Sequence, residues 1–201
     1  MDLVIFAAGA TLVLNSRTSQ VVAAYVILTG LVSLIVAPSA LATPLSQALF
    51  VLAFVLKLVA APIGIWSFAF RNPAARDLHP AVSLPWRLIA VLVAAALAAG
   101  VVRAPEFMMM SMAGPAAYTA LCGFAMLLIH RNLLAQLIGL LALGSGLTLG
   151  SAVLAPGLPE AIEFGAAFDA LVVTFIGLAL VRAFLAHNPL LDVESLRSLR
   201  G

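Results

Sequence analysis

The stretch LSQALFVLAFVLKLVAAPIGIWSFAF, from Leu45 to Phe70, decides the fold of this chain. It is apolar almost throughout and long enough for one membrane-spanning helix, which needs about 20 such residues. Lys57 is its only charged residue. A charge at bilayer depth costs about 2.5–3.5 kcal/mol on insertion scales, so it normally faces a partner or a water-filled path. The stretch therefore predicts a membrane helix that carries a functional lysine.

The composition of the whole chain places it in the membrane class. Its 201 residues are 64% hydrophobic and 9% charged, with a mean hydropathy of +1.19, whereas a soluble domain is typically about 45–50% apolar and about 25% charged. The formal net charge is only +2 and no Lys/Arg-rich run is present, so nucleic acid is excluded as a partner. We predict an all-α, polytopic integral membrane protein in the lipid bilayer of the cell inner (cytoplasmic) membrane.

Seven apolar segments approach the length of a membrane span. The first is the shortest, and because the start of the chain lacks a basic region we expect it to be a membrane helix, not a cleaved signal peptide. Prolines mark most of the breaks, namely Pro38 and Pro44, then Pro73, Pro80 and Pro85, then Pro105, and finally Pro156 and Pro159. The segments run from Asp2 to Asn15, Gln20 to Ala37, Leu45 to Phe70, Trp86 to Val102, Met110 to Ile129, Leu133 to Ala155 and Ile162 to Ala186.

The segments predict one transmembrane helical domain over residues 1–187 and a short cytoplasmic tail over residues 188–201. The tail has the polar sequence NPLLDVESLRSLRG, in which the leucines form one apolar stripe. We expect this tail to lie on a neighbouring subunit or on the membrane surface.

The placement of the basic residues predicts the orientation, because cytoplasmic loops carry an excess of Lys and Arg. In a seven-helix arrangement, eight arginines fall at alternate helix boundaries, and only Arg103 falls at the opposite boundaries. The N-terminus is therefore predicted outside and the C-terminus in the cytoplasm. The eight are Arg17, Arg71, Arg76, Arg87, Arg131, Arg182, Arg197 and Arg200.

Motifs for catalysis or cofactor binding are missing from the sequence. Cys122 is the only cysteine, and its apolar surroundings predict a small packed side chain. The histidines His79, His130 and His187 lie far apart, without metal-ligand spacing. No phosphate loop, nucleophile–base pair or haem motif is present. We expect no cofactor and no catalysis by this chain alone.

Lys57 is followed five residues later by Pro62, which removes a backbone donor and loosens the preceding turn. A lysine beside such a turn finds carbonyl partners or water, and buried lysines change protonation state readily. The alternative is a lysine held permanently in an ion pair. We favour a proton carrier, because a lone buried lysine is rare without a function.

Three acidic residues lie within the last apolar segment or just before it. Asp169 is six residues beyond Glu163, about 9 Å along a helix, and is too deep to be explained by capping. Glu160 and Glu163 lie nearer the predicted outer boundary, where the helix dipole alone would favour them. Thr174 offers a hydroxyl to a water chain, although we expect it to bond back to its own helix. Lys57, Asp169, Glu163 and Glu160 are thus the candidate proton-relay residues.

Interfaces are predicted at two further places. Gly146 and Gly150 form a small-xxx-small pair, which favours close helix contact, while a local break or π-bulge near Gly144 is the alternative. His130 and Arg131 precede the sixth segment and serve either as a positive-inside anchor or as a docking site for a partner.

Three ordered blocks of the C-terminal third resemble component E of hydrogenase 4, a membrane subunit of formate hydrogenlyase-type complexes. They are RNLLAQLIGLLALGSGLTLG (131–150), PEAIEFGAAFDALV (159–172) and LDVESLRSLRG (191–201), and VLKLVAAPIGI (55–65) resembles the lysine–proline helix of that family. Residues 113–187 are more distantly similar to the K-type subunit of respiratory complex I and the C-type subunit of multisubunit cation/proton antiporters.

The resemblance implies an accessory subunit of a redox-driven, ion-translocating oxidoreductase complex. Antiporter-like and other membrane-arm subunits would be its partners, with a soluble redox module coupled indirectly. Lys57 matches the intramembrane lysine of the family, and Glu160, Glu163 and Asp169 match its acidic positions. The chain departs from the pattern at Gly144 and Ser145, where the family often has Glu-Asn. The position nearest the carboxylate of the K-type subunit is Leu141, so this helix supplies no acid.

Three interpretations remain open from the sequence. Lys57 and Asp169 carry protons with water or with a group from a neighbouring subunit, or the chain is a scaffold whose charges only pair with neighbours. A stand-alone small transporter is the third, and the lack of an internal repeat argues against it.

Overall fold

A computed structural model describes residues 2–40, 43–71, 76–78, 80–103, 112–155 and 158–187. Apart from two isolated bridges, the regular structure in these ranges is helical, which confirms the all-α prediction. The predicted tail, residues 188–201, lies outside the described residues, as does the expected start of the fifth segment at Met110.

The helices correspond one by one to the seven predicted segments. Five helical stretches are long and apolar enough to cross a membrane, and Asp2–Leu14 and Ala113–Ile129 are shorter apolar helices. Three consecutive elements form one uninterrupted stretch, Pro44–Arg71. The elements are α1 (Asp2–Leu14), α2 (Thr18–Ala40), α3 (Pro44–Val55), η1 (Leu56–Ala60), α4 (Ala61–Arg71), α5 (Leu84–Arg103), α6 (Ala113–Ile129), α7 (Leu133–Leu154) and α8 (Pro159–His187).

Four prolines predicted to mark the connections lie inside helices instead, and one of them, Pro159, is the first residue of α8. Pro38 lies within α2, which continues to Ala40, and Pro85 lies in the first turn of α5. A proline in the first turn costs little because its missing N–H would have no helical partner there. Pro44 follows the same rule as the first residue of α3, after the N-cap Thr43.

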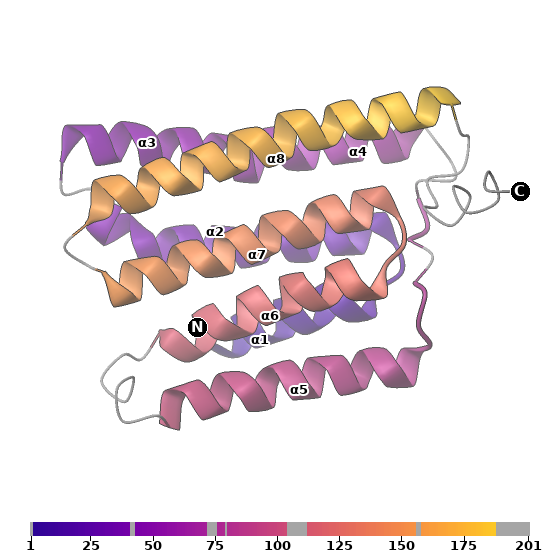
Figure 1. Cartoon of the computed structure of the whole chain (residues 1–201), viewed down its shortest axis with the longest axis horizontal. Helices are drawn as coiled ribbons and strands as arrows, with labels where there is room; N and C mark the ends of the chain where they lie inside the picture. The colour runs from indigo at the N-terminus through magenta and orange to yellow at the C-terminus, as the bar shows by residue number, and fades with distance from the viewer. Residues whose placement is uncertain are drawn as a thin grey trace, which may run out of the picture.

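The helices form two layers (Figure 1). One layer contains α8, α7 and α6, and the other contains α3 with α4, α2 and α1, so that α8 lies on α3, α7 on α2 and α6 on α1. Helix α5 lies at the edge, against α6 and α1. The predicted relay residues therefore come from facing helices of opposite layers, with Lys57 on η1 and Asp169 on α8.

Small residues bring α6 and α7 into close contact. A Cβ built on Gly146 would lie 2.7 Å from the Cα of Ala120, and one built on Gly139 would lie 3.0 Å from the carbonyl oxygen of Gly123. Gly150 lies beside Ala116 in the same seam. The prediction of close helix contact is confirmed, whereas the alternative of a break near Gly144 is wrong, because α7 is α-helical over its whole length.

Tyr118 and the predicted packed cysteine join α6 to α1. The Tyr118 hydroxyl donates to the carbonyl of Phe6 at 3.0 Å, and Gly9 leaves room for the Tyr118 ring and the Cys122 Sγ. Cys122 is fully buried, as predicted. Helix α1 is thus held within the bundle although it is only 13 residues long.

One end of the bundle collects six arginines of the described residues: Arg17, Arg71, Arg76, Arg87, Arg131 and Arg182. Arg87 is buried there and donates to the carbonyl of Leu14 at 2.6 Å and to Ser16 Oγ at 3.2 Å. It thereby satisfies a carbonyl that the end of α1 leaves unpaired. This common end agrees with the predicted topology, and which side of the membrane it faces stays a prediction.

We predict that Gly146→Ala destabilises the protein by about 1–3 kcal/mol, because the added methyl would collide with the Ala120 backbone across the α6–α7 seam. Thermal unfolding of the detergent-solubilised protein measures the effect. Gly100→Ala is the matched control, since a Cβ at Gly100 on α5 meets nothing within 4 Å. Equal melting temperatures for the two variants would contradict the close contact.

Candidate functional site: a buried lysine near two carboxylates

The Lys57 backbone sits in a π-helical turn, Leu56–Ala60. The Ala61 N–H bonds to the carbonyl of Leu56, five residues back, and Pro62 has no N–H. The carbonyl of Lys57 is therefore left without a donor from its own helix, and the Tyr25 hydroxyl of α2 donates to it at 3.0 Å. The predicted loosening before Pro62 is confirmed, and it takes the form of a wider turn that is closed by a side chain from outside.

The Lys57 ammonium lies in the interior between the layers. Its side chain is only 5% exposed, and Nζ donates to Thr148 Oγ1 of α7 at 3.4 Å. Thr148 in turn donates to the carbonyl of Gly144 at 2.8 Å. Within the described residues, Lys57 forms no ion pair shorter than 4 Å. Here the lysine is held by a long hydrogen bond to a hydroxyl, not by a permanent salt bridge.

A small cavity with both polar and apolar walls adjoins the lysine between α2, α3, η1, α7 and α8. Its volume of about 20 Å³ is enough for roughly one water molecule. Glu163, which is 2% exposed, lies at this cavity. The hydroxyls of Thr29 and Ser145 share a hydrogen bond of 3.3 Å across it. The polar side chains along the cavity are Thr29, Ser33, Lys57, Ser145, Thr148 and Glu163.

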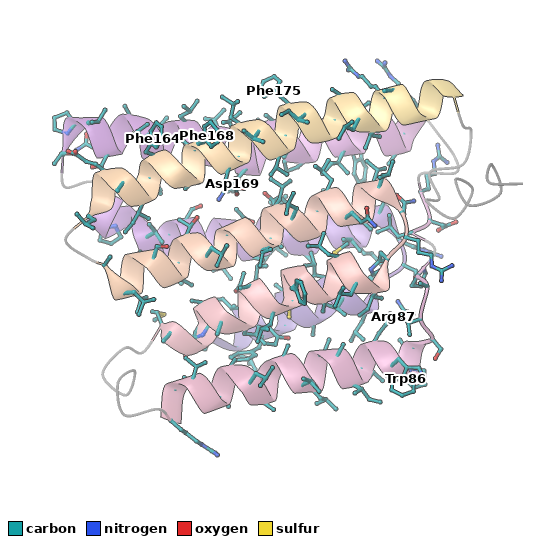
Figure 2. All side chains as sticks on the ribbon, viewed as in Figure 1. Trp86, Arg87, Phe164, Phe168, Asp169 and Phe175 are labelled. Carbon is teal, nitrogen blue, oxygen red and sulfur yellow. The ribbon has the colours of Figure 1, made fainter. Side chains whose placement is uncertain are left out.

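Asp169 lies on the side of α8 that faces α7, while Phe164, Phe168 and Phe175 lie along the outer side (Figure 2). Its Oδ2 is buried and has no hydrogen-bond partner among the described residues. That oxygen rests against Gly144, because a Cβ built on Gly144 would collide with it. Gly144 thus makes room for the carboxyl of Asp169 from α8. It stands at the position where hydrogenase-4 component E, which the sequence resembles, often has Glu.

A second, larger hollow opens beside Asp169 between α7 and α8, with a volume of about 520 Å³. Thr148 and Ala166 line both this hollow and the small cavity that contains Glu163. Thr148 therefore borders the hollows of both carboxylates, and its hydroxyl accepts a hydrogen bond from the Lys57 ammonium. Lys57 thus shares the small cavity with Glu163, while the hydroxyl that accepts its hydrogen bond also borders the hollow of Asp169.

Glu160 and Thr174 do not join this cluster. Glu160 is exposed, and its Oε1 accepts a hydrogen bond of 2.8 Å from Thr43 Oγ1, which links the start of α8 to the N-cap of α3. Thr174 is buried, but its hydroxyl has no partner among the described residues. The expected back-bond of Thr174 to its own helix is therefore wrong.

The predicted interface residues lie elsewhere. His130 is 1% exposed and ends α6, beside Pro80, so its ring is not presented on the surface for docking. Arg131 is exposed at the same end. Asn132 caps α7 by accepting from the N–H of Leu134 at 2.8 Å. The His130–Arg131 segment thus makes the turn between α6 and α7, and a docking role for Arg131 stays a prediction.

Sequence reasoning missed Thr148, Tyr25 and Thr29. Their hydroxyls resemble the many others in membrane helices that bond only to their own backbone. One available signal was spacing, because Ser145 and Thr148 follow Gly144 on adjacent turns of one helix face. Among the described residues, no group of three His, Cys, Asp or Glu side chains is placed to hold a metal ion.

Comparison with known proteins gives one match. The family model for NADH-ubiquinone/plastoquinone oxidoreductase chain 4L matches residues 111–201. The matched part is somewhat less than half of the chain and includes α6, α7 and α8, hence Glu163, Asp169 and Thr148, but not Lys57. No curated protein and no solved structure matches the chain.

We predict energetic coupling between Gly144 and Asp169. Gly144→Ala should cost about 1–3 kcal/mol, because the new methyl displaces a carboxyl group packed against it. In an Asp169→Ala background the same change should cost almost nothing, since no carboxyl remains to be displaced. Melting temperatures of the four proteins of this double-mutant cycle measure the coupling, and additive effects would contradict the contact.

We predict that acid destabilises the protein through His130. Burial lowers the pKa of His130, and the positive charge of Arg87 acts in the same direction. The unfolded chain, with a histidine pKa of about 6.5, then binds the proton more tightly than the folded protein. The stabilising contribution of neutral His130 is complete above that pH and is lost as the pH falls from about 6.5 through the lower folded pKa.

Thermal unfolding at a series of pH values measures this effect, with His130→Gln as the non-titrating comparison. The melting temperature of the unsubstituted protein should fall more steeply below about pH 6.5 than that of the variant. Parallel curves would show that His130 does not contribute to the pH dependence.

Proposed function

We propose that this chain is an accessory membrane subunit of a complex I-like, ion-translocating oxidoreductase complex, in which it holds protonatable side chains along a proton or cation path. The similarity of residues 111–201 to chain 4L of NADH-ubiquinone/plastoquinone oxidoreductase supports membership of such a complex. The chain catalyses no reaction alone and binds no cofactor in this proposal. Antiporter-like and other membrane-arm subunits are its partners, and a soluble redox module drives it indirectly.

The observation that carries the proposal is the position of Lys57. Its ammonium is buried at the middle of the long helical stretch Pro44–Arg71 and donates to Thr148, which lines the hollows of both Glu163 and Asp169. A lysine that served only to neutralise one carboxylate would be expected to sit in an ion pair with it. In the present arrangement Lys57 is paired with neither carboxylate, so it can exchange protons with both, as a proton relay requires.

The polar groups define an order of transfer. The Lys57 ammonium first releases a proton through Thr148 into the hollow of Asp169, where the carboxylate accepts it, and the neutral amine then accepts a proton from Glu163 across the small cavity. Each transfer changes the charge felt by the next group, because the two carboxylates and the ammonium share a medium that screens poorly. A conformational or redox change in a neighbouring subunit would drive the proton along this order.

The finer assignment rests on sequence resemblance. The blocks at 131–150, 159–172 and 191–201, together with the lysine–proline stretch at 55–65, support component E of hydrogenase 4 as the nearest functional type. In this assignment the complex is a group 4 hydrogenase of the formate hydrogenlyase type in the cell inner membrane. The match to chain 4L and the hydrogenase resemblance agree on a membrane arm and differ only in the redox module attached to it.

Substitutions in the assembled complex test the relay. We expect Lys57→Met and Asp169→Asn to leave assembly intact and to lower the rate of proton translocation about tenfold or more, equivalent to about 1.4 kcal/mol or more. Thr148→Val should lower translocation less than these two substitutions do. Thr148→Ser should leave translocation close to that of the unsubstituted complex, because serine keeps the required hydroxyl. Acidification of inverted membrane vesicles, followed with a pH-sensitive dye during the redox reaction of the complex, measures translocation.

Arg103→Gln serves as the control, since Arg103 is exposed at the far end of α5. Unchanged translocation in the Lys57 and Asp169 variants would remove both residues from the path. Loss of assembly in these variants, seen as failure to co-purify with antiporter-like subunits, would favour a scaffold role instead.

A further inference from the structure

A hollow of about 370 Å³ lies at the arginine-rich end of the bundle, where α2 begins and α4 ends. It is remote from the Lys57 cluster and shares no lining residue with the cavities of Glu163 and Asp169. Its walls combine guanidinium groups, hydroxyls and large aromatic rings. The side chains that matter here are Arg17, Ser19, Trp66, Phe70, Arg76 and Asp77.

The polar wall of the hollow carries an excess of positive charge. Arg76 is oriented by its Nε and Nη2, which donate to the carbonyls of Ala69 and Phe70 at 3.4 and 3.3 Å. These bonds leave its Nη1 without a partner in the described residues. Arg17 is exposed, and its guanidinium makes no hydrogen bond or ion pair with another described residue. Asp77 supplies the single carboxylate, so two cationic groups and one anionic group face the hollow.

The apolar wall continues from the hollow along the helices. Ile63, Trp66 and Phe70 are 60%, 51% and 72% exposed and follow one another on one face of α4. On α2, Ser19, Ala23 and Ile27 are exposed at four-residue spacing, so they also share a face. Both stripes start at the hollow, because Ser19, Trp66 and Phe70 line it. A polar pocket thus leads into an apolar track.

The depth of the hollow matches the boundary of a bilayer. Trp66 precedes Arg71, the last residue of α4, by five residues, or about 7.5 Å along the helix. Tryptophan favours the level of the lipid headgroups, with its ring in the apolar layer and its N–H toward the polar layer. The headgroup layer is about 5–7 Å thick on each side of the hydrocarbon core. With Trp66 at this level, we expect the arginines at the height of the phosphate groups and the aromatic rings at the height of the first acyl carbons.

We propose that this hollow binds one anionic phospholipid, with its phosphodiester on Arg17 and Arg76 and an acyl chain along the exposed faces of α4 and α2. Guanidinium groups bind phosphate oxygens through directed, charge-assisted hydrogen bonds. The net positive lining favours a lipid with a net negative charge over a zwitterionic one. Asp77 would accept a hydrogen bond from a hydroxyl-bearing headgroup such as glycerol. A free phosphate would use the same arginines but would gain nothing from the apolar track.

Lipid titration of the full-length chain, purified from membranes in mild detergent with any subunits that remain bound, tests the site. Native mass spectrometry would count the molecules retained as phosphatidylglycerol, phosphatidylcholine, glycerol phosphate or inorganic phosphate is added. We expect one phosphatidylglycerol to be retained at concentrations where phosphatidylcholine and both soluble phosphates are not. Arg17→Gln should weaken that binding about fivefold, the effect of about 1 kcal/mol for one arginine near anionic lipid.

Arg103→Gln is the matched control, because Arg103 is an exposed arginine at the opposite end of the bundle. It should retain phosphatidylglycerol as the unsubstituted chain does. Equal retention of phosphatidylcholine, equal weakening by the two substitutions, or no effect of Arg17→Gln would overturn the proposal. Binding of inorganic phosphate as tight as that of the lipid would show an anion site without a lipid, and would overturn it as well. Trp66→Leu should lower the fraction of the chain that retains phosphatidylglycerol, because the acyl chain loses part of its apolar contact.

Discussion

The missing helical hydrogen bond at the Lys57 carbonyl is the constraint on which the arrangement of this protein depends. Pro62 removes one helical donor, and the π turn directs the Ala61 N–H to Leu56, so the carbonyl of Lys57 must find a donor elsewhere. An unpaired carbonyl in a membrane interior costs several kcal/mol. The Tyr25 hydroxyl satisfies it from the other side of the α2–η1 contact. That bond fixes the position of the lysine relative to α2, and with it the direction in which the ammonium reaches α7.

The position of the Lys57 ammonium also determines which residues α7 can carry. The helix must offer an oxygen to Nζ, which Thr148 does, and it must leave space for the carboxyl of Asp169, which Gly144 does. It must also approach α6 closely, which requires Gly146. Helix α7 therefore carries the Thr148 hydroxyl toward Lys57, Gly144 toward Asp169 and Gly146 toward α6. These requirements account for the sequence GLLALGSGLTLG without invoking a flexible helix.

Much of the fold was predictable from the sequence, because apolar length and proline positions mark membrane helices strongly. The helix ends near Pro38 and Pro85 were wrong, since proline is tolerated in a first turn and near a helix end, so its presence does not by itself place a boundary. The loosened turn at Lys57 was predictable from Pro62 alone. The role of Gly144 was not, because it depends on which residue of α8 lies opposite, and sequence contains no information on that register.

The residues of the Lys57 cluster come from two parts of the chain, of which only one matches the family model. Glu163, Asp169 and Thr148 lie within the part that matches chain 4L, whereas Lys57 and Tyr25 lie outside it. A three-helix unit of α6, α7 and α8 alone would hold two carboxylates with no cation beside them. The N-terminal helices supply both the lysine and the Tyr25 hydroxyl that fixes its backbone. The positive charge of one layer therefore lies near the two carboxylates of the other layer. The burial of Glu163 and of the Asp169 Oδ2 in the C-terminal part is thus explained only together with the helix from Pro44 to Arg71.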